Sequence, residues 1–208
     1  MREAVLYIHG KGGNPEEAGQ YSGFCGGRDV IGVHYNPNSP LEALKDILCA
    51  YEKALSDYVA VYIIANSIGA YFSMLALQGH EVKMALFISP VVDMEGLILN
   101  MMRRANVTEN ELRERGEAPT SFGETLSWEY LSYVRDNRIS WDALTEILYA
   151  GGDNLTARQT IEQFAARHGA GLTVMENGEH WFHTEEQLAF LHGWVGDKLG
   201  GRDLALGK

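Results

Sequence analysis

Short apolar runs alternate with stretches of helical periodicity along most of the chain. Six of these runs predict strands, at residues 4–8, 30–34, 59–65, 84–89, 146–150 and 172–176. Each run is apolar at nearly every position rather than at alternate positions, so both faces of the sheet should be covered. The pattern predicts an α/β fold with a mostly parallel sheet of about six strands and helices on both faces.

Capping residues mark where several helices between these strands should begin. The expected caps are Asn14 before Pro15, Ser39 before Pro40, Thr156 with Gln159, and Thr184 with Gln187. The apolar positions of the helix after Pro40 are Leu41, Leu44, Ile47, Leu48 and Leu55. Those of the last helix are Leu188, Leu191, Trp194, Val195 and Leu199, which share one face at helical spacing.

Residues 93–140 interrupt the alternation of strands and helices. The segment is too long for a single crossover helix, and it is rich in Met, Leu and aromatic residues, which suit apolar contacts. We expect one domain over residues 1–208 that carries this segment as an insertion. A frayed tail is expected from residue 200 onward.

The stretch Ala65-Asn66-Ser67-Ile68-Gly69 lies between an apolar run and a helical pattern. A serine between small residues at a sharp strand-to-helix turn is typical of a nucleophile elbow. The turn forces Ser67 into a strained backbone conformation, and larger side chains at positions 65 and 69 would collide with neighbouring backbone. Ala65 stands where glycine is usual, and it still meets the size requirement.

Other chemistry-bearing residues follow predicted strands. The strand at 4–8 runs into His9-Gly10-Lys11-Gly12-Gly13, the strand at 146–150 into Asp153, and the strand at 172–176 into His180. Ser67, Asp153 and His180 therefore occur in the order nucleophile, acid, base, each beyond the carboxyl end of a strand.

In these features the chain resembles the α/β-hydrolase family, from residue 4 to about residue 199. The resemblance implies that Ser67 is the nucleophile, Asp153 the acid and His180 the base. It implies that the backbone N–H groups of Lys11 and Ile68 form the oxyanion hole. It further implies that the insertion is a helical cap over the nucleophile, with candidate substrate-binding residues Met101, Met102 and Trp128.

Two residues compete for these roles. Asp93 follows the strand at 84–89, a position that some members of the family use for the acid, but it also begins the insertion. His183 lies three residues after His180 and immediately before the Thr184 cap, where a structural role is the alternative. Chain order favours Asp153, and the loop position favours His180.

The resemblance implies a serine hydrolase that cleaves a carboxylic ester or thioester of a small, largely apolar acyl group through an acyl-enzyme intermediate. A serine peptidase or amidase, and a non-catalytic ligand-binding protein on the same fold, are the alternatives. Gly10 and Gly12 after a strand are also compatible with a dinucleotide site. That interpretation is disfavoured because Pro15 replaces the third glycine and the second strand lacks a terminal acid.

Composition narrows the expected partners. With 28 acidic and 17 basic residues the net charge is -11, which argues against nucleic acid. Cys25 and Cys49 are expected to be free thiols of a reducing compartment.

No apolar run approaches the roughly 18 residues of a membrane span. The first strand leaves no room for a signal peptide, so a cytoplasmic location is expected. No metal-ligand spacing is present, and neither metal nor cofactor is expected. The oligomeric state is left open.

Overall fold

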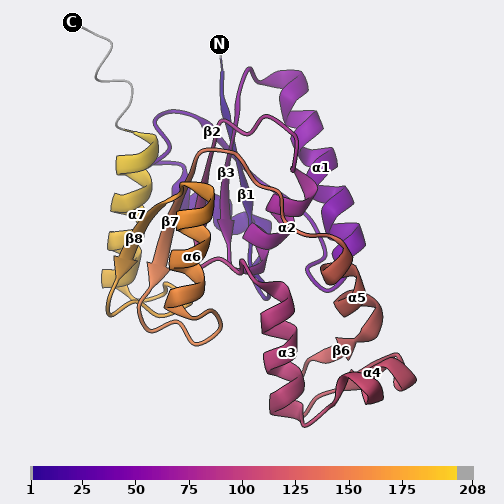
Figure 1. The fold of residues 1–208 in the computed structure, drawn as a ribbon. Coiled ribbons are helices and arrows are strands. Elements are labelled where there is room, and N and C mark those ends of the chain that lie inside the picture. The colour runs from indigo at the N-terminus through magenta and orange to yellow at the C-terminus, as the bar shows by residue number, and fades with distance from the viewer. Residues whose placement is uncertain (1, 201–208) are drawn as a thin grey trace, which may run out of the picture. The chain divides into compact units, whose positions relative to one another are not determined.

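Six parallel strands form the central sheet (Figure 1). In chain order they are β1 (Ala4–Ile8), β2 (Asp29–Gly32), β3 (Val61–Asn66), β4 (Met84–Ile88), β7 (Thr145–Ala150) and β8 (Gly171–Met175). Across the sheet their order is β2-β1-β3-β4-β7-β8, and every pair of neighbours is parallel. The predicted α/β fold with about six strands is confirmed. The structure, a computed structural model, describes residues 2–200, so positions 201–208 of the predicted tail lie outside the described residues.

Helices cover both faces of this sheet. On one face, α1 (Pro40–Asp57) and α2 (Ile68–Ala76) pack against each other and against β1 and β3. On the other face, alternate strand residues such as Val5, Tyr7 and Ile64 join an apolar cluster with α7 (Glu185–Leu199) and the 3₁₀ helix η1 (Pro15–Tyr21). The helix α6 (Arg158–His168) packs against β7 and β8. The strands are therefore shielded on both sides, which explains their continuous apolar character.

The predicted apolar face is buried in α7 but only partly buried in α1. In α7, Leu191, Trp194, Val195 and Leu199 all lie in the apolar cluster, and Leu188 packs against it. In α1 the buried residues are Ala43, Ile47, Tyr51 and Ala54, whereas Leu41 and Leu55 are exposed. Of the predicted apolar positions of α1, Ile47 is therefore buried as expected, and the rest of the buried face consists of two alanines and Tyr51.

A nearly buried guanidinium ties distant parts of the chain together. Arg28 donates to the Glu3 carboxylate at 2.8 Å and to the Leu199 carbonyl at 2.9 Å. It also bonds the Cys25 carbonyl at 3.1 Å and lies over the Tyr62 ring at 4.4 Å. Because only 8% of its side chain is exposed, these contacts replace the water that the charge loses. They fix the start of β1 to the end of α7.

Residues Asp93–Ile139 form a second compact unit. It contains α3 (Met94–Ala105), α4 (Glu109–Arg115), the antiparallel pair β5 (Glu117–Pro119) and β6 (Thr125–Ser127), and α5 (Trp128–Asp136). Arg135 of α5 bonds Glu95 of α3 at 2.7 Å and forks onto both carboxylate oxygens of Glu109 of α4. One arginine therefore links the three helices of this unit, in the bidentate geometry that favours such pairs.

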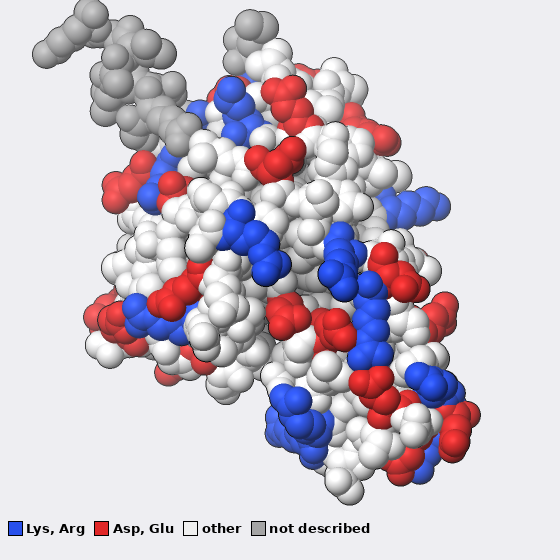
Figure 2. All heavy atoms as spheres, viewed as in Figure 1, with Lys and Arg blue, Asp and Glu red and all other residues white. Residues whose placement is uncertain are grey.

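Charged side chains of the described residues are mixed in sign on the face shown in Figure 2, where Lys and Arg lie in small groups among Asp and Glu. Among the described residues, no helix has the length and apolar character to cross a membrane.

Candidate active site

Ser67 occupies the turn between β3 and α2 with φ 53° and ψ -120°. A positive φ is unusual for a residue with a side chain, and such a conformation costs about 1–3 kcal/mol. Two backbone hydrogen bonds link it to the segment at the end of β4. The Ser67 N–H donates to the Ile88 carbonyl at 3.0 Å, and the Ser67 carbonyl accepts from the Val91 N–H at 3.0 Å. The turn is thus anchored to the carboxyl end of β4 and presents Ser67 beyond the sheet edge.

Small residues around the turn are required by close backbone contacts. A Cβ added to Gly69 would lie 2.5 Å from the His9 carbonyl oxygen and 2.7 Å from that of Ile8. A Cβ added to Gly10 would lie 3.2 Å from the Ser67 Cβ. The glycine loop after β1 therefore lies directly against the serine, and the first turn of α2 lies directly against the end of β1.

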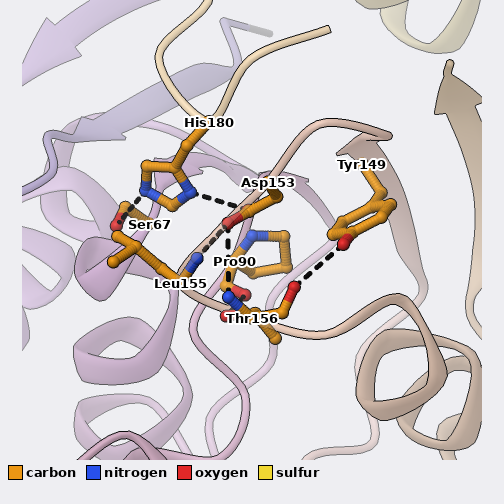
Figure 3. Close-up of polar contacts among 7 residues, drawn as sticks. All are labelled: Ser67, Pro90, Tyr149, Asp153, Leu155, Thr156 and His180. Atoms are coloured by element: carbon orange, nitrogen blue, oxygen red, sulfur yellow. Dashed lines mark hydrogen bonds and ion pairs between the residues drawn. The ribbon is translucent and has the colours of Figure 1, made fainter. Parts of the chain in front are cut away.

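Ser67, His180 and Asp153 form a continuous hydrogen-bond chain (Figure 3). His180 Nε2 lies 2.9 Å from Ser67 Oγ, and His180 Nδ1 lies 2.7 Å from Asp153 Oδ2. Because the carboxylate can only accept, Nδ1 carries the proton and donates it, which leaves the Nε2 lone pair for the serine hydroxyl. The geometry matches a nucleophile, a base and an acid that orients the base.

The Asp153 carboxylate is held from its other side. Its Oδ1 accepts the N–H of Leu155 at 2.7 Å and that of Thr156 at 3.2 Å, and its side chain has no exposed surface. The Tyr149 hydroxyl donates to the Thr156 carbonyl at 2.8 Å and stabilises the same loop (Figure 3). Burial raises the pKa of Tyr149, and the nearby negative Asp153 raises it further.

One predicted cap near this loop was wrong. The N-cap of α6 is Ala157, without a side-chain cap, and Thr156 does not form a box with Gln159. Thr156 is buried, and its hydroxyl donates to the Pro90 carbonyl at 3.4 Å. Packing of the Asp153 loop onto the segment after β4 therefore takes the hydroxyl that a cap would have used. By contrast, Thr184 accepts the Gln187 N–H and caps α7 as predicted.

The competing residues make other contacts, although His183 also lines the cavity beside Ser67. His183 Nδ1 is 2.6 Å from the Trp181 carbonyl oxygen, and its side chain is 56% exposed. Asp93 caps α3 by accepting the Gly96 N–H at 2.9 Å. His9 is buried, with Nδ1 2.8 Å from the Gly10 carbonyl oxygen and its ring stacked on Tyr35. The structure brings His180 and Asp153 to Ser67, and it gives the other residues local structural contacts.

The two predicted oxyanion donors come from segments that border Ser67. Lys11 follows Gly10 in the loop after β1, and Ile68 is the first residue of α2. An N–H group in the first turn of a helix has no acceptor within the helix, so that of Ile68 is suited to a ligand oxygen. Their roles stay predictions.

A cavity of about 350 Å³ opens beside Ser67 and His180. Its apolar wall includes Ile88, Leu188 and Leu191, together with Trp181, a residue that is 66% exposed. Its polar wall includes Glu17, Gln20, Tyr21 and Asn66. These polar residues were not predicted as site residues. Two of them lie near a predicted feature: Asn66 directly precedes Ser67 in the predicted turn, and Glu17 Oε1 accepts the N–H of the predicted cap residue Asn14 at 3.3 Å.

The predicted substrate-binding residues of the insertion differ in exposure. Met102 is buried, whereas Met101 and Trp128 are half-buried. The Arg113 guanidinium lies 4.5 Å from the centre of the Trp128 ring. Among the described residues, no group of three or more His, Cys, Asp or Glu side chains is arranged to hold a metal ion.

The sheet order and the strand-serine-helix turn define the α/β-hydrolase fold, as the sequence predicted. Structure comparison agrees. The protein is similar to mouse alpha/beta hydrolase domain-containing protein 10, at 15% identity and TM-score 0.74, over 95% of this chain and 90% of that chain. It is similar to Est1E from Butyrivibrio proteoclasticus, at 17% identity and TM-score 0.70, over 98% of this chain and 88% of that chain. It is also similar to an esterase from Pyrobaculum calidifontis, at 15% identity and TM-score 0.67, over 98% of this chain and 78% of that chain. No family model matches the sequence, and a search of curated proteins found no match.

Proposed function

We propose that the protein is a serine hydrolase that cleaves a carboxylic ester or thioester of a small, largely apolar acyl group. The observation that carries this proposal is the hydrogen-bond chain from Ser67 Oγ through His180 to the buried Asp153 carboxylate. Such a chain activates a hydroxyl that is otherwise a weak nucleophile. The strained backbone of Ser67 supports the same proposal, because strain held by surrounding contacts is frequent at active sites.

The reaction has two halves. Ser67 Oγ attacks the acyl carbonyl while His180 Nε2 takes its proton, and the tetrahedral intermediate forms. The carbonyl oxygen gains the negative charge and accepts the N–H groups of Lys11 and Ile68, each worth about 3 kcal/mol. The carbonyl then re-forms, the bond to the alcohol or thiol breaks, and His180 returns the proton to the leaving group. Water repeats the sequence on the acyl-enzyme with His180 as base, and it releases the acid and the free serine.

The volume and the lining of the cavity beside Ser67 support a small substrate. A volume of about 350 Å³ accommodates a modest acyl or alcohol group, and its aliphatic wall suits a largely apolar one. Among the structurally similar proteins, the Pyrobaculum calidifontis protein is an esterase, and Est1E has been solved with ferulic acid bound. These proteins share the fold of this chain at low sequence identity. Their names are compatible with the proposal that this chain also acts on an ester.

We also infer that the unit Asp93–Ile139 contributes to substrate selection as a cap. Its half-buried Met101 and Trp128 are the residues to test, and Met102 is expected to support them from within the unit. Truncation of Met101 or Trp128 to Ala should change the order of preference across esters of graded acyl length. An unchanged order of preference in both variants would contradict this role.

The function is tested by labelling with a small fluorophosphonate, which reacts readily only with an activated serine. The parent protein should label at one site and hydrolyse a panel of esters graded in acyl length. Ser67→Ala should lose both labelling and turnover while its melting temperature stays close to that of the parent. His180→Ala should also lose nearly all turnover.

His183→Ala is the matched control, because it removes a neighbouring imidazole whose Nδ1 contacts the Trp181 carbonyl oxygen instead of Ser67 or Asp153. It should keep labelling and turnover. Persistent labelling of Ser67→Ala would refute the nucleophile. Absence of labelling in the parent would favour a ligand-binding protein without turnover.

A further inference from the structure

Trp181 differs from the other three tryptophans of the chain in its exposure. Trp141 and Trp194 are buried, and the indole N–H of each donates to a threonine hydroxyl. Trp128 is half-buried, and a guanidinium lies over its ring. Trp181 is 66% exposed. Because the backbone is a small part of the surface of a tryptophan, most of this exposed area belongs to the indole.

Trp181 lies at the mouth of the cavity beside Ser67. It directly follows His180 in the chain, and both residues line the cavity. A residue that belongs to the wall and is also largely exposed lies where the wall meets solvent. An ester whose carbonyl is bound at Ser67 would place its attached groups in this cavity, within reach of Trp181.

Contacts on both sides fix the backbone of Trp181. The preceding residue, His180, is held by its two side-chain hydrogen bonds. The following residue, Phe182, is buried in the apolar cluster at the sheet, and the His183 N–H donates to Gln187 Oε1 at 3.1 Å. The indole itself turns about only two side-chain bonds. Such a side chain offers a large contact area at a low cost in conformational entropy.

The charges of the cavity wall favour a neutral ligand. Among the described residues, the wall contains one carboxylate, Glu17, and one ammonium, Lys11. The Glu17 carboxylate also accepts the Tyr7 hydroxyl at 2.5 Å and the Asn14 N–H at 3.3 Å. A cation on the ligand would meet Lys11, and an anion would meet Glu17, so neither sign of charge is matched by the wall as a whole.

An indole distinguishes aromatic from saturated rings. Aromatic pairs adopt offset-stacked or edge-to-face arrangements that stabilise them beyond the apolar area they bury. The aliphatic wall formed by Ile88, Leu188 and Leu191 contacts either kind of ring equally well. Any preference for the aromatic ring would therefore come from Trp181.

We propose that Trp181 is a substrate-binding residue that packs against an aromatic ring in the acyl or the alcohol part of the ester. The inference rests on the proposed hydrolase function, because it names the substrate class of that site: neutral esters that carry an aromatic ring. Ser67 and His180 act on the ester carbonyl, and Trp181 encloses the ring at the mouth of the cavity.

A lipid surface is the other partner that an exposed indole suits, since tryptophan is enriched where proteins meet membranes. The charges near Trp181 disfavour it. Glu179, Glu185 and Glu186 are all exposed and lie close to Trp181 in the chain. Carboxylates in these positions are repelled by anionic lipids.

The test measures binding by the Ser67→Ala protein, which lacks the nucleophile. Calorimetry compares two ester pairs that differ only in the saturation of the ring. The acyl pair is methyl 3-phenylpropanoate and methyl 3-cyclohexylpropanoate, and the alcohol pair is benzyl acetate and cyclohexylmethyl acetate. The ratio of the two dissociation constants in a pair cancels the contacts that both rings make. Adding Trp181→Ala should reduce the preference for the aromatic ester about five-fold in at least one pair. Trp181→Phe should retain part of it.

Quenching of tryptophan fluorescence by iodide gives a second measurement. Trp141 and Trp194 are buried, so the fraction of fluorescence accessible to iodide should come largely from Trp181. The aromatic ester that shows the preference should protect this fraction in the Ser67→Ala protein. The protection should be absent once Trp181→Ala is added.

Phe190→Ala is the matched control. It also removes an exposed aromatic side chain, but Phe190 is 40% exposed on α7 and is not part of the cavity wall. It should keep both the ratio and the protection. Both alanine variants should melt close to the temperature of their background protein, because substitutions at exposed positions change stability little.

Several results would overturn the role of Trp181. They are an unchanged ratio in both pairs after Trp181→Ala, an equal fall in Phe190→Ala, no iodide protection by a saturating aromatic ester, and no binding by any ester. Protection by phosphatidylcholine vesicles in place of the esters would indicate membrane docking instead. Fluorophosphonate labelling of the parent tests the hydrolase function separately, so the two failures are distinguishable.

Discussion

Replacement of Gly69 by Ala tests how closely α2 must approach β1. The new Cβ would lie 2.5 Å from the His9 carbonyl oxygen, and ordinary contact begins at 3.4 Å, so the first turn of α2 must retreat by about 0.9 Å. Ser67 leads into that turn, and its hydroxyl now lies 2.9 Å from His180 Nε2. A misplacement of about 1 Å in a reacting group costs about 100-fold in rate. The overpacking itself should cost about 2 kcal/mol of the free energy of unfolding.

The assay compares kcat/KM on a short-chain ester, the fluorophosphonate labelling rate and the melting temperature. Gly69→Ala should lower kcat/KM and the labelling rate by about 100-fold, and its melting temperature should be about 4–8 °C lower. Gly193→Ala is the control: it lies inside α7, where an added Cβ meets nothing within 4 Å. It should keep the parent rate and gain about 0.5–1 kcal/mol, because alanine is the better helix former. Parent-like activity and stability in Gly69→Ala would refute the argument that this contact positions the serine.

Three further changes have defined outcomes. Asp153→Asn should lower kcat by about 10⁴-fold, because the amide favours the wrong imidazole tautomer of His180. Asp93 caps a helix, so Asp93→Asn should alter ester hydrolysis little. A larger loss of kcat in Asp93→Asn than in Asp153→Asn would make Asp93 the catalytic acid. Burial raises the pKa of the Cys25 thiol to about 11, so at pH 8 an aromatic disulfide reagent should titrate only the exposed Cys49 in the native protein, and Cys49→Ser should abolish this reaction. Burial lowers the pKa of His192 below its ordinary 6.5, so the native state binds this proton more weakly than the unfolded state does. The free energy of unfolding from urea titrations should therefore fall as the pH drops below about 6.5, and His192→Gln should show a smaller fall; an equal fall would exclude this contribution.

Local chemistry explains which parts of the fold were predictable. The first strand was predicted with the same bounds that the structure has, because Ala4–Ile8 is apolar throughout and ends at a glycine loop. The serine turn was predictable because its requirements lie within five consecutive residues. The pair β5 and β6 was missed, since strands of three residues are too short to produce an alternating pattern.

Tertiary packing decided the rest of the site. Glu17 lies in the first turn of the helix expected after the Asn14 cap, yet the Tyr7 hydroxyl donates to it across 10 residues of sequence and it lines the cavity. Tyr21 carries no local signal of any kind, because its burial depends on η1 folding against the sheet. Thr156 had a convincing capping pattern, but contact with the Pro90 carbonyl took precedence. Patterns of neighbouring residues do not encode such contacts.

The cover that α7 gives to one face of the sheet has a consequence for synthesis. Every strand of the sheet precedes α7 in the chain, and Leu191, Trp194 and Val195 complete the cluster around Tyr7 and Ile64. A nascent chain that has emerged only as far as β8 therefore displays the part of this apolar sheet face that α7 covers in the folded protein. Such surfaces promote aggregation, and native packing must wait until the helix leaves the ribosome. The last helix thus sets the moment during translation at which the serine turn, the histidine loop and the cavity can assume their final arrangement.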